Sequence, residues 1–278
     1  MLWGPFHANT CGMRYKLGIS TCPNDTFMFH GLLTGRVACE GFELDIELLD
    51  VQQLNEGLER GTFHFSKASC FAASLLKDRF EVSPSGAALG YGVGPLVLSR
   101  PGAPVPMPQA RVLTPGGMTT AYLLFQHFFP APRSIRHVVF SEIMPALERG
   151  DADVGVVIHE GRFTYRESGL GFIADLGQEW EREFSLPLPL GCIVADRSVP
   201  AEHRAAFAQG VKRSIEYAYA HRDETLPTMR RYAQELADSV IWQHVDLYVN
   251  EWSLELGEIG TKAFLQFEKL VEERARSR

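Results

Sequence analysis

One histidine in the sequence has a position that suits acid–base chemistry. His159 follows the apolar run Val156-Val157-Ile158, so it stands at the carboxyl end of a predicted buried strand. Ligands of open α/β sheets gather at that edge, and a neutral imidazole can take a proton from a bound substrate near neutral pH. The same position also suits a histidine that caps the helix predicted to begin near Glu160. The position alone does not separate these two interpretations.

Two small hydroxyl residues begin a predicted helix before that strand. Thr119 and Thr120 follow the small-residue turn Thr114-Pro115-Gly116-Gly117-Met118, and helical spacing is predicted for 118–128. A helix N-terminus offers unpaired N–H groups and a partial positive charge, which suit a carboxylate or a phosphate. The alternative is a plain helix cap, the commonest role of a threonine at this position.

Lys67, Ala68 and Ser69 repeat this pattern nearer the start of the chain. A short predicted strand at 63–65 leads into them, and they begin a helix predicted to run to residue 76. The alternative is a cap beside a surface lysine. Two such helix N-termini and a histidine at a strand end are more suggestive of a small-molecule site together than each is separately.

Asn24 and Asp25 lie at the first predicted turn from strand to helix, at the same edge of the sheet. Short polar side chains at such a turn commonly cap the following helix. We therefore interpret them as caps of a helix at 26–34, with contact to a ligand as the alternative.

Other kinds of chemistry have no matching motif. The stretch Gly90-x-Gly92-x-Gly94 precedes a strand, whereas a dinucleotide fingerprint follows one, so we interpret it as a hinge or a close-packed turn. The histidines are scattered with no H-E-x-x-H or C-x-x-C spacing, which predicts no metal site. A G-x-S-x-G nucleophile motif is also missing.

Composition narrows the class of protein. The 278 residues are 45% hydrophobic and 22% charged, as in ordinary globular proteins, and the net charge of −7 argues against a nucleic-acid partner. Five cysteines without a paired spacing are typical of a reducing compartment. The sequence contains no apolar window of about 18 residues, so no membrane partner is expected. We predict a cytoplasmic protein with a flexible extension at 1–12, or a true start at Met13.

Strand and helix patterns alternate along the chain and predict an α/β fold. The proline-rich segment 101–108 and a second segment at 187–195 are the predicted crossings between two lobes. The predicted first lobe is therefore discontinuous, with 13–100 and 195–278, and the second lobe is 101–194. Pockets favour the cleft between such lobes.

Several of these segments together resemble a known family, the 1,4-dihydroxy-6-naphthoate synthases of the futalosine route to menaquinone. The resemblance runs from Met13 through nearly all of the chain, in the same order. It is carried by C-P-N-D-T-F at 22–27, G-Y-G-V-G-P-L at 90–96, T-T-A-Y at 119–122, H-E-G-R-F-T-Y at 159–165, L-P-L-P-L-G at 186–191 and Y-V-N at 248–250.

The resemblance implies a two-lobed fold similar to that of periplasmic binding proteins (type II). It implies conversion of cyclic de-hypoxanthinylfutalosine to 1,4-dihydroxy-6-naphthoate with release of dihydroxyacetone, without a metal or an organic cofactor. His159 matches the proposed general base of the family. Ala68 stands where the family has a larger aliphatic residue, so a backbone contact would be kept there while a packing contact would differ. The implied substrate-binding residues are Lys67, Ala68, Ser69, Thr119 and Thr120.

Two other functions fit the same fold. One is a non-catalytic binding protein for a small carboxylate, and the other is a chorismate dehydratase of the same pathway. The motifs above favour the naphthoate synthases. In each case the expected partner is a small-molecule carboxylate.

Overall fold

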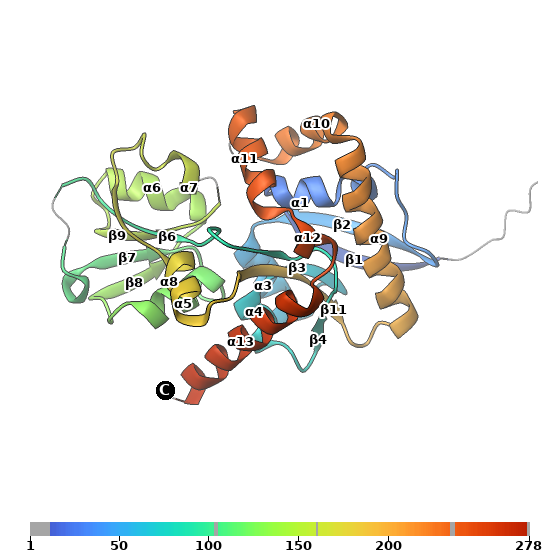
Figure 1. Cartoon of the computed structure of the whole chain (residues 1–278), viewed down its shortest axis with the longest axis horizontal. Coiled ribbons are helices and arrows are strands. Elements are labelled where there is room, and N and C mark those ends of the chain that lie inside the picture. The colour runs from blue at the N-terminus through green and yellow to red at the C-terminus, as the bar shows by residue number, and fades with distance from the viewer. Residues whose placement is uncertain (1–11, 103–104, 160, 234–236, 277–278) are drawn as a thin grey trace, which may run out of the picture.

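A computed structural model describes residues 12–102, 105–159, 161–233 and 237–276, and its strands form two separate sheets (Figure 1). The predicted α/β class is confirmed. Residues 1–11 of the predicted extension lie outside the described residues. We call each sheet, with the helices packed on it, a lobe.

The sheet of the first lobe has the strand order β2-β1-β3-β11-β4, and β5 pairs with β11. β1 runs parallel to β2 and β3, whereas β11 is antiparallel to its neighbours. The strands of this sheet are β1 (Met13–Ser20), β2 (Phe42–Leu49), β3 (Phe65–Ser69), β4 (Phe80–Val82), β5 (Ala88–Gly90) and β11 (Leu188–Asp196).

Both faces of this sheet are covered because successive strand residues point to opposite sides. In β11, Ile193 and Ala195 pack into one apolar cluster and Cys192 and Val194 into another. Helices that contribute to the first cluster are α1 (Pro23–Met28), α2 (His30–Leu33), α9 (Ala201–Ala220), α10 (Arg222–Tyr232), α11 (Asp238–Tyr248) and α12 (Glu251–Leu254). The second cluster includes residues of α3 (Val51–Arg60), α4 (Cys70–Leu75) and α13 (Gly257–Arg276), and it continues into the second lobe.

The sheet of the second lobe has the order β10-β6-β9-β7-β8, with β9 in the middle and buried throughout. Its strands are β6 (Leu96–Ser99), β7 (Arg111–Thr114), β8 (Ser134–His137), β9 (Val154–Val157) and β10 (Gly171–Asp175). Its helices are α5 (Thr120–Phe128), α6 (Phe140–Glu148), α7 (Gly161–Thr164), α8 (Leu176–Phe184) and the 3₁₀ helix η1 (Met107–Gln109).

The chain changes sheets between β5 and β6, and again between α8 and β11. β6 therefore lies in the second sheet, although the predicted limit at 100/101 puts it in the first lobe. β11 lies in the first sheet, although the predicted limit at 194/195 puts most of it in the second lobe. The proline-rich segment 101–108 connects β6 with β7 inside the second lobe. Proline has no N–H for a strand ladder, so such a segment indicates a surface connection without indicating a change of lobe.

The glycine-rich stretch is a close-packed turn at the first crossing, one of the two predicted interpretations. A Cβ atom on Gly94 would overlap the backbone of Gly177 in the first turn of α8. Only a glycine lets the crossing segment approach that helix so closely.

The predicted helix positions agree best with the structure where the hydrophobic pattern repeats over many residues. Residues 201–220 form α9 as predicted, whereas the helix predicted at 26–34 is two short helices, α1 and α2. The helix predicted from Lys67 begins at Cys70, since Lys67, Ala68 and Ser69 belong to β3. Among the described helices, none is both long and apolar enough to cross a membrane.

Candidate functional site

A pocket between the two lobes brings all six predicted site residues together. It has about 680 Å³ of empty space, including its mouth. The first lobe contributes β3, the start of α1 and part of α11, and the second lobe contributes the start of α5 and the end of β9. The predicted residues that line it are Lys67, Ala68, Ser69, Thr119, Thr120 and His159.

His159 reaches the pocket from a left-handed backbone conformation. It stands two residues after the end of β9 with φ 58°, and the only other described non-glycine residue with a positive φ is Ser185. Such a conformation costs about 1–3 kcal/mol and is common at functional sites. Arg162 holds the following segment in place, since it donates to Gly94 O at 2.6 Å and pairs with Asp175 at 2.7 Å.

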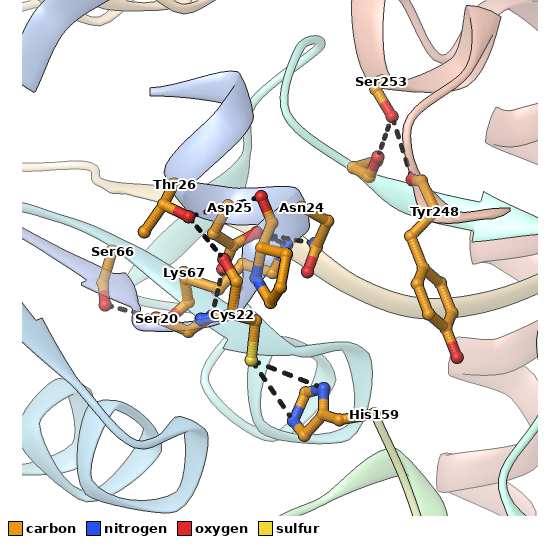
Figure 2. Close-up of polar contacts among 12 residues, drawn as sticks. Ser20, Cys22, Asn24, Asp25, Thr26, Ser66, Lys67, His159, Tyr248 and Ser253 are labelled. Atoms are coloured by element: carbon orange, nitrogen blue, oxygen red, sulfur yellow. Dashed lines mark hydrogen bonds and ion pairs between the residues drawn. The ribbon is translucent and has the colours of Figure 1, made fainter. Parts of the chain in front are cut away.

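The imidazole of His159 lies between side chains of both lobes. The Sγ atom of Cys22, the N-cap residue of α1, is 3.4 Å from Nδ1 and 3.6 Å from Nε2, as the dashed lines of Figure 2 show. Phe140 of α6 meets the ring edge-on with 4.7 Å between centroids, and His244 of α11 is nearly parallel to it at 5.9 Å. Contacts on several sides fix the direction of the ring.

Burial keeps His159 in its neutral form. Removal from water lowers the pKa of His159 to about 4; the negative charge of Asp25 acts against that shift and the positive charge of Lys67 adds to it. A neutral imidazole at pH 7 has a lone pair and can accept a proton.

The second lobe presents the N-terminus of α5 to the pocket. Thr119 is the N-cap residue, and its Oγ1 accepts from the N–H of Tyr122 and donates to Gly116 O at 2.7 Å. Thr120 donates through Oγ1 to Leu190 O at 2.8 Å, across to β11. Thr119 is therefore the cap of α5, as one of the two interpretations predicted. The backbone N–H groups at the first two helical positions lie beside it and have no partner inside the helix.

A buried ion pair lies under the other side of the pocket. Lys67 Nζ donates to Asp25 Oδ1 at 2.7 Å, and the two side chains are 7% and 0% exposed. Asp25 also accepts from Ser20 Oγ at 2.6 Å and from Asn24 Nδ2 at 2.9 Å. Three donors thus compensate one carboxylate that has no solvent-exposed surface (Figure 2).

The interpretation of Asn24 and Asp25 as caps is wrong. α1 begins at Pro23 with Cys22 at its N-cap and without a side-chain cap bond, so both residues lie inside the helix. The proline at the first helical position sets the helix start one turn earlier than the sequence pattern suggested. Their polar groups serve the ion pair instead.

Asn55 of α3 holds the backbone at the end of β3. The amide of Asn55 accepts from Ser69 N at 3.0 Å and donates to Ser69 Oγ at 3.0 Å. The backbone donor of Ser69 is therefore already in use, although its hydroxyl hydrogen is still available to a ligand.

The lobes touch around the pocket through the same elements. Gln52 of α3 accepts from Met118 N at 3.4 Å, and a Cβ atom on Gly116 would overlap the Gln52 amide. Asn55 donates to Met118 O at 3.4 Å, and Phe71 N donates to Thr120 Oγ1 at 3.4 Å. The N-termini of α4 and α5 therefore lie beside each other.

Cys22 and His244 are among the residues of the site that were not predicted from the sequence. Cys22 belongs to a recognised motif, but a cysteine there has no chemical signature without its distant partner. His244 shares a helix face with Ile241, Val245 and Tyr248, all buried. A histidine within an apolar stripe is the signal that could have found it.

No group of three His, Cys, Asp or Glu side chains in the described ranges could hold a metal ion. The described residues instead supply a neutral imidazole, a helix N-terminus that suits an anion, and donors for neutral oxygens. This set suits proton transfer on a small carboxylate.

A family model described as menaquinone biosynthesis matches residues 15–273. Two curated proteins are similar over 89% of the chain: the 1,4-dihydroxy-6-naphtoate synthase of Thermus thermophilus, 44% identical over 90% of its length, and that of Streptomyces coelicolor, 40% identical over 89%.

Solved structures agree with the fold. Protein AF1704 of Archaeoglobus fulgidus matches 94% of this chain and 98% of its own, with a TM-score of 0.89 and 26% identity. The ligand-binding component of an ABC-type import system from Staphylococcus aureus matches 95% of this chain and 92% of its own, with a TM-score of 0.69 and 13% identity. The periplasmic aliphatic sulphonate binding protein SsuA of Escherichia coli matches 95% of this chain and 93% of its own, with a TM-score of 0.61 and 15% identity. The predicted fold, two-lobed and like that of periplasmic binding proteins, is confirmed.

The buried ion pair predicts a large stability effect. Lys67→Met leaves the Asp25 charge buried without a cation, so we expect a loss of about 3–5 kcal/mol in the free energy of unfolding, measured by urea denaturation at pH 7. Asp25→Asn combined with Lys67→Met removes both charges and is expected to cost less than Lys67→Met alone.

Lys77→Met is the matched control. Its ion pair with Glu272 is 2.6 Å long but lies at the surface, so a change below about 1 kcal/mol is expected. A double variant as unstable as the sum of its single variants would contradict this account of the pair.

Proposed function

The chain belongs to the menaquinone biosynthesis family, and on that basis we propose that it converts cyclic de-hypoxanthinylfutalosine to 1,4-dihydroxy-6-naphthoate with release of dihydroxyacetone. The relatives named above support this reaction, and the residues that resemble the family line one pocket. In this proposal the protein is a cytoplasmic carbon–carbon lyase that uses no cofactor.

The observation that carries the proposal is the state of His159. A neutral imidazole is held by contacts from both lobes, beside a helix N-terminus that can bind a carboxylate. A protein that only binds a carboxylate has no need of a base in this place.

In the proposed reaction, His159 takes a proton from the substrate, a carbon–carbon bond breaks, and the departing dihydroxyacetone fragment takes up a proton in return. The aromatic ring of the naphthoate forms, and this favours the products. The reaction divides one molecule into two and needs no oxidant or reductant. Contact between the lobes would exclude water and fix the geometry of the substrate.

We place the carboxylate of the substrate at the start of α5. Thr120 and Ala121 occupy the first two helical positions, whose N–H groups have no carbonyl partner inside the helix, and both residues line the pocket. Before α4, Asp25 compensates the charge of Lys67, and the N–H of Ser69 already donates to the side chain of Asn55. The Lys67–Ser69 side is therefore better suited to the neutral hydroxyls of the sugar remnant.

His159→Ala is expected to lower kcat by about 10²–10⁴-fold while substrate affinity stays near the wild-type value, because a positioned base acts mainly on the chemical step. The naphthoate is detected by mass spectrometry, and affinity by calorimetry. His127→Ala, which removes a histidine paired with Glu183 away from the pocket, is the control and should keep full activity. Unchanged turnover in His159→Ala would exclude the base role. Binding without product in the wild type would instead indicate a binding protein.

The pKa of His159 predicts where activity falls in acid. The base is inactive once protonated, and protonation of the free enzyme is expected near pH 4 and not near 6.5. The acidic limb of kcat/KM should therefore lie near pH 4, and circular dichroism at each pH checks that the protein is folded. A limb near pH 6.5 would mean that another group titrates or that the ring is hydrated.

Two substitutions at one position test the carboxylate site. Thr120→Val removes the hydroxyl alone, whereas Thr120→Pro also removes the backbone N–H and suits the first position of a helix. A hydrogen bond to a charged group contributes about 1.5–3 kcal/mol, so KM should be about 10- to 150-fold higher in Thr120→Pro than in Thr120→Val. Equal KM values would move the carboxylate away from this N–H group.

A further inference from the structure

One buried titratable side chain of the pocket has no role in the mechanism above. His244 projects from α11, is 1% exposed and lines the same pocket as His159. Its Nε2 atom is 2.9 Å from Asn24 Oδ1. Its Nδ1 atom is buried and has no hydrogen-bond partner among the described residues.

The neighbouring ion pair fixes which nitrogen of His244 carries the hydrogen. The carboxylate of Asp25 can only accept, so the group of Asn24 that faces it must be the NH₂ group. The carbonyl oxygen of Asn24 then faces His244, and an oxygen acceptor requires a hydrogen on Nε2. Lys67 holds Asp25 in place, so a series of hydrogen bonds runs from Lys67 through Asp25 and Asn24 to the imidazole of His244.

The other nitrogen of His244 is therefore a lone-pair acceptor. Burial, His159 and Lys67 all lower the pKa of His244 well below its ordinary value, so the ring is neutral and a hydrogen on Nε2 leaves Nδ1 without one. A buried acceptor without a donor costs about 1–3 kcal/mol. In a native site such a group calls for an explanation, and a ligand that supplies the donor is one.

We infer that His244 contacts the substrate: its Nδ1 atom accepts a hydrogen bond from a hydroxyl group of the bound molecule, and Asn24, Asp25 and Lys67 orient it for this purpose. The inference rests on the proposed function, in which the sugar remnant supplies such hydroxyls. It assigns His244 to substrate orientation, while His159 remains the base.

The charge of the pocket explains why the partner is a hydroxyl. A neutral nitrogen with a lone pair repels a carboxylate, and the carboxylate already has the N-terminus of α5. His244 and His159 are nearly parallel, with 5.9 Å between ring centroids and an angle of 21° between planes. Two neutral imidazoles at this spacing can each contact a different polar group of one small ligand.

A pair of substitutions separates the two nitrogens of His244. His244→Gln places an amide near the former Nε2 position, which keeps a donor for Asn24 but removes the acceptor. His244→Asn places an amide oxygen near the former Nδ1 position, which keeps the acceptor but loses the contact to Asn24. We expect kcat/KM to fall about 5- to 150-fold in His244→Gln. His244→Asn should keep more of kcat/KM, although it is the less stable of the two in urea.

His30→Gln is the matched control. His30 is also buried, its Nδ1 atom bonds Thr228 Oγ1 at 2.9 Å, and it is not among the residues that line the pocket. Its substitution reports the general effect of losing a buried imidazole. A kcat/KM of His244→Gln that equals the wild-type value, or a loss no larger than that of His30→Gln, would overturn the inference.

A spectroscopic measurement tests the contact without turnover. In ¹⁵N-histidine-labelled His159→Ala protein, the Nδ1 signal of His244 should have the shift of an unprotonated nitrogen. It should move in the direction of hydrogen bonding when cyclic de-hypoxanthinylfutalosine is added. A protonated Nδ1 in the free protein, or a bound substrate that leaves the signal unmoved, would overturn the inference.

Failure of the proposed function gives a different result. In that case wild-type protein forms no naphthoate and calorimetry detects no binding of this substrate, and the substrate contact assigned to His244 falls with it. Normal turnover together with an unmoved Nδ1 signal overturns the role of His244 alone.

Discussion

The carboxylate of Asp25 is the group on which the arrangement of the pocket depends. A carboxylate with no exposed surface is stable only when donors surround it, and Ser20, Asn24 and Lys67 supply them from β1, α1 and β3. This requirement brings the ends of two strands and the start of a helix to one point. It also sets the amide of Asn24, and through it the imidazole of His244. A single buried charge thus orients groups on four elements of the first lobe.

His159 belongs to the other lobe, so the pocket is formed only where the two lobes meet. His159 is held by Phe140 from its own side and by Cys22 from the opposite side. The start of α5 meets α3, α4 and β11 in the same way, through Gln52 and Asn55, the N–H of Phe71 and the oxygen of Leu190. In the proposed reaction, division of the groups between two lobes makes the geometry of the site depend on contact between the lobes.

The fold is shared with binding proteins of the periplasmic type, so the fold by itself does not account for chemistry. The pocket of this chain is lined by two histidines, His159 and His244. Burial lowers the pKa of both histidines, so that each imidazole is neutral and has a lone pair at neutral pH. A binding site built from N–H groups and hydroxyls holds a carboxylate equally well. In the proposed reaction, the imidazole of His159 adds a place for the proton to go.

The sequence alone determined the fold class, most of the helices and the six predicted residues of the pocket. These follow from local periodicity and from motifs whose residues are close together, such as the buried strand before His159 or the turn before Thr119. Tertiary structure alone decided the lobe of β6 and β11, because strand pairing joins segments far apart in the chain. It also decided that Asp25 pairs with Lys67 and is not a cap. The contacts of His244 with Asn24 and of Cys22 with His159 span 220 and 137 residues, and no local pattern encodes which distant partner a buried polar side chain meets.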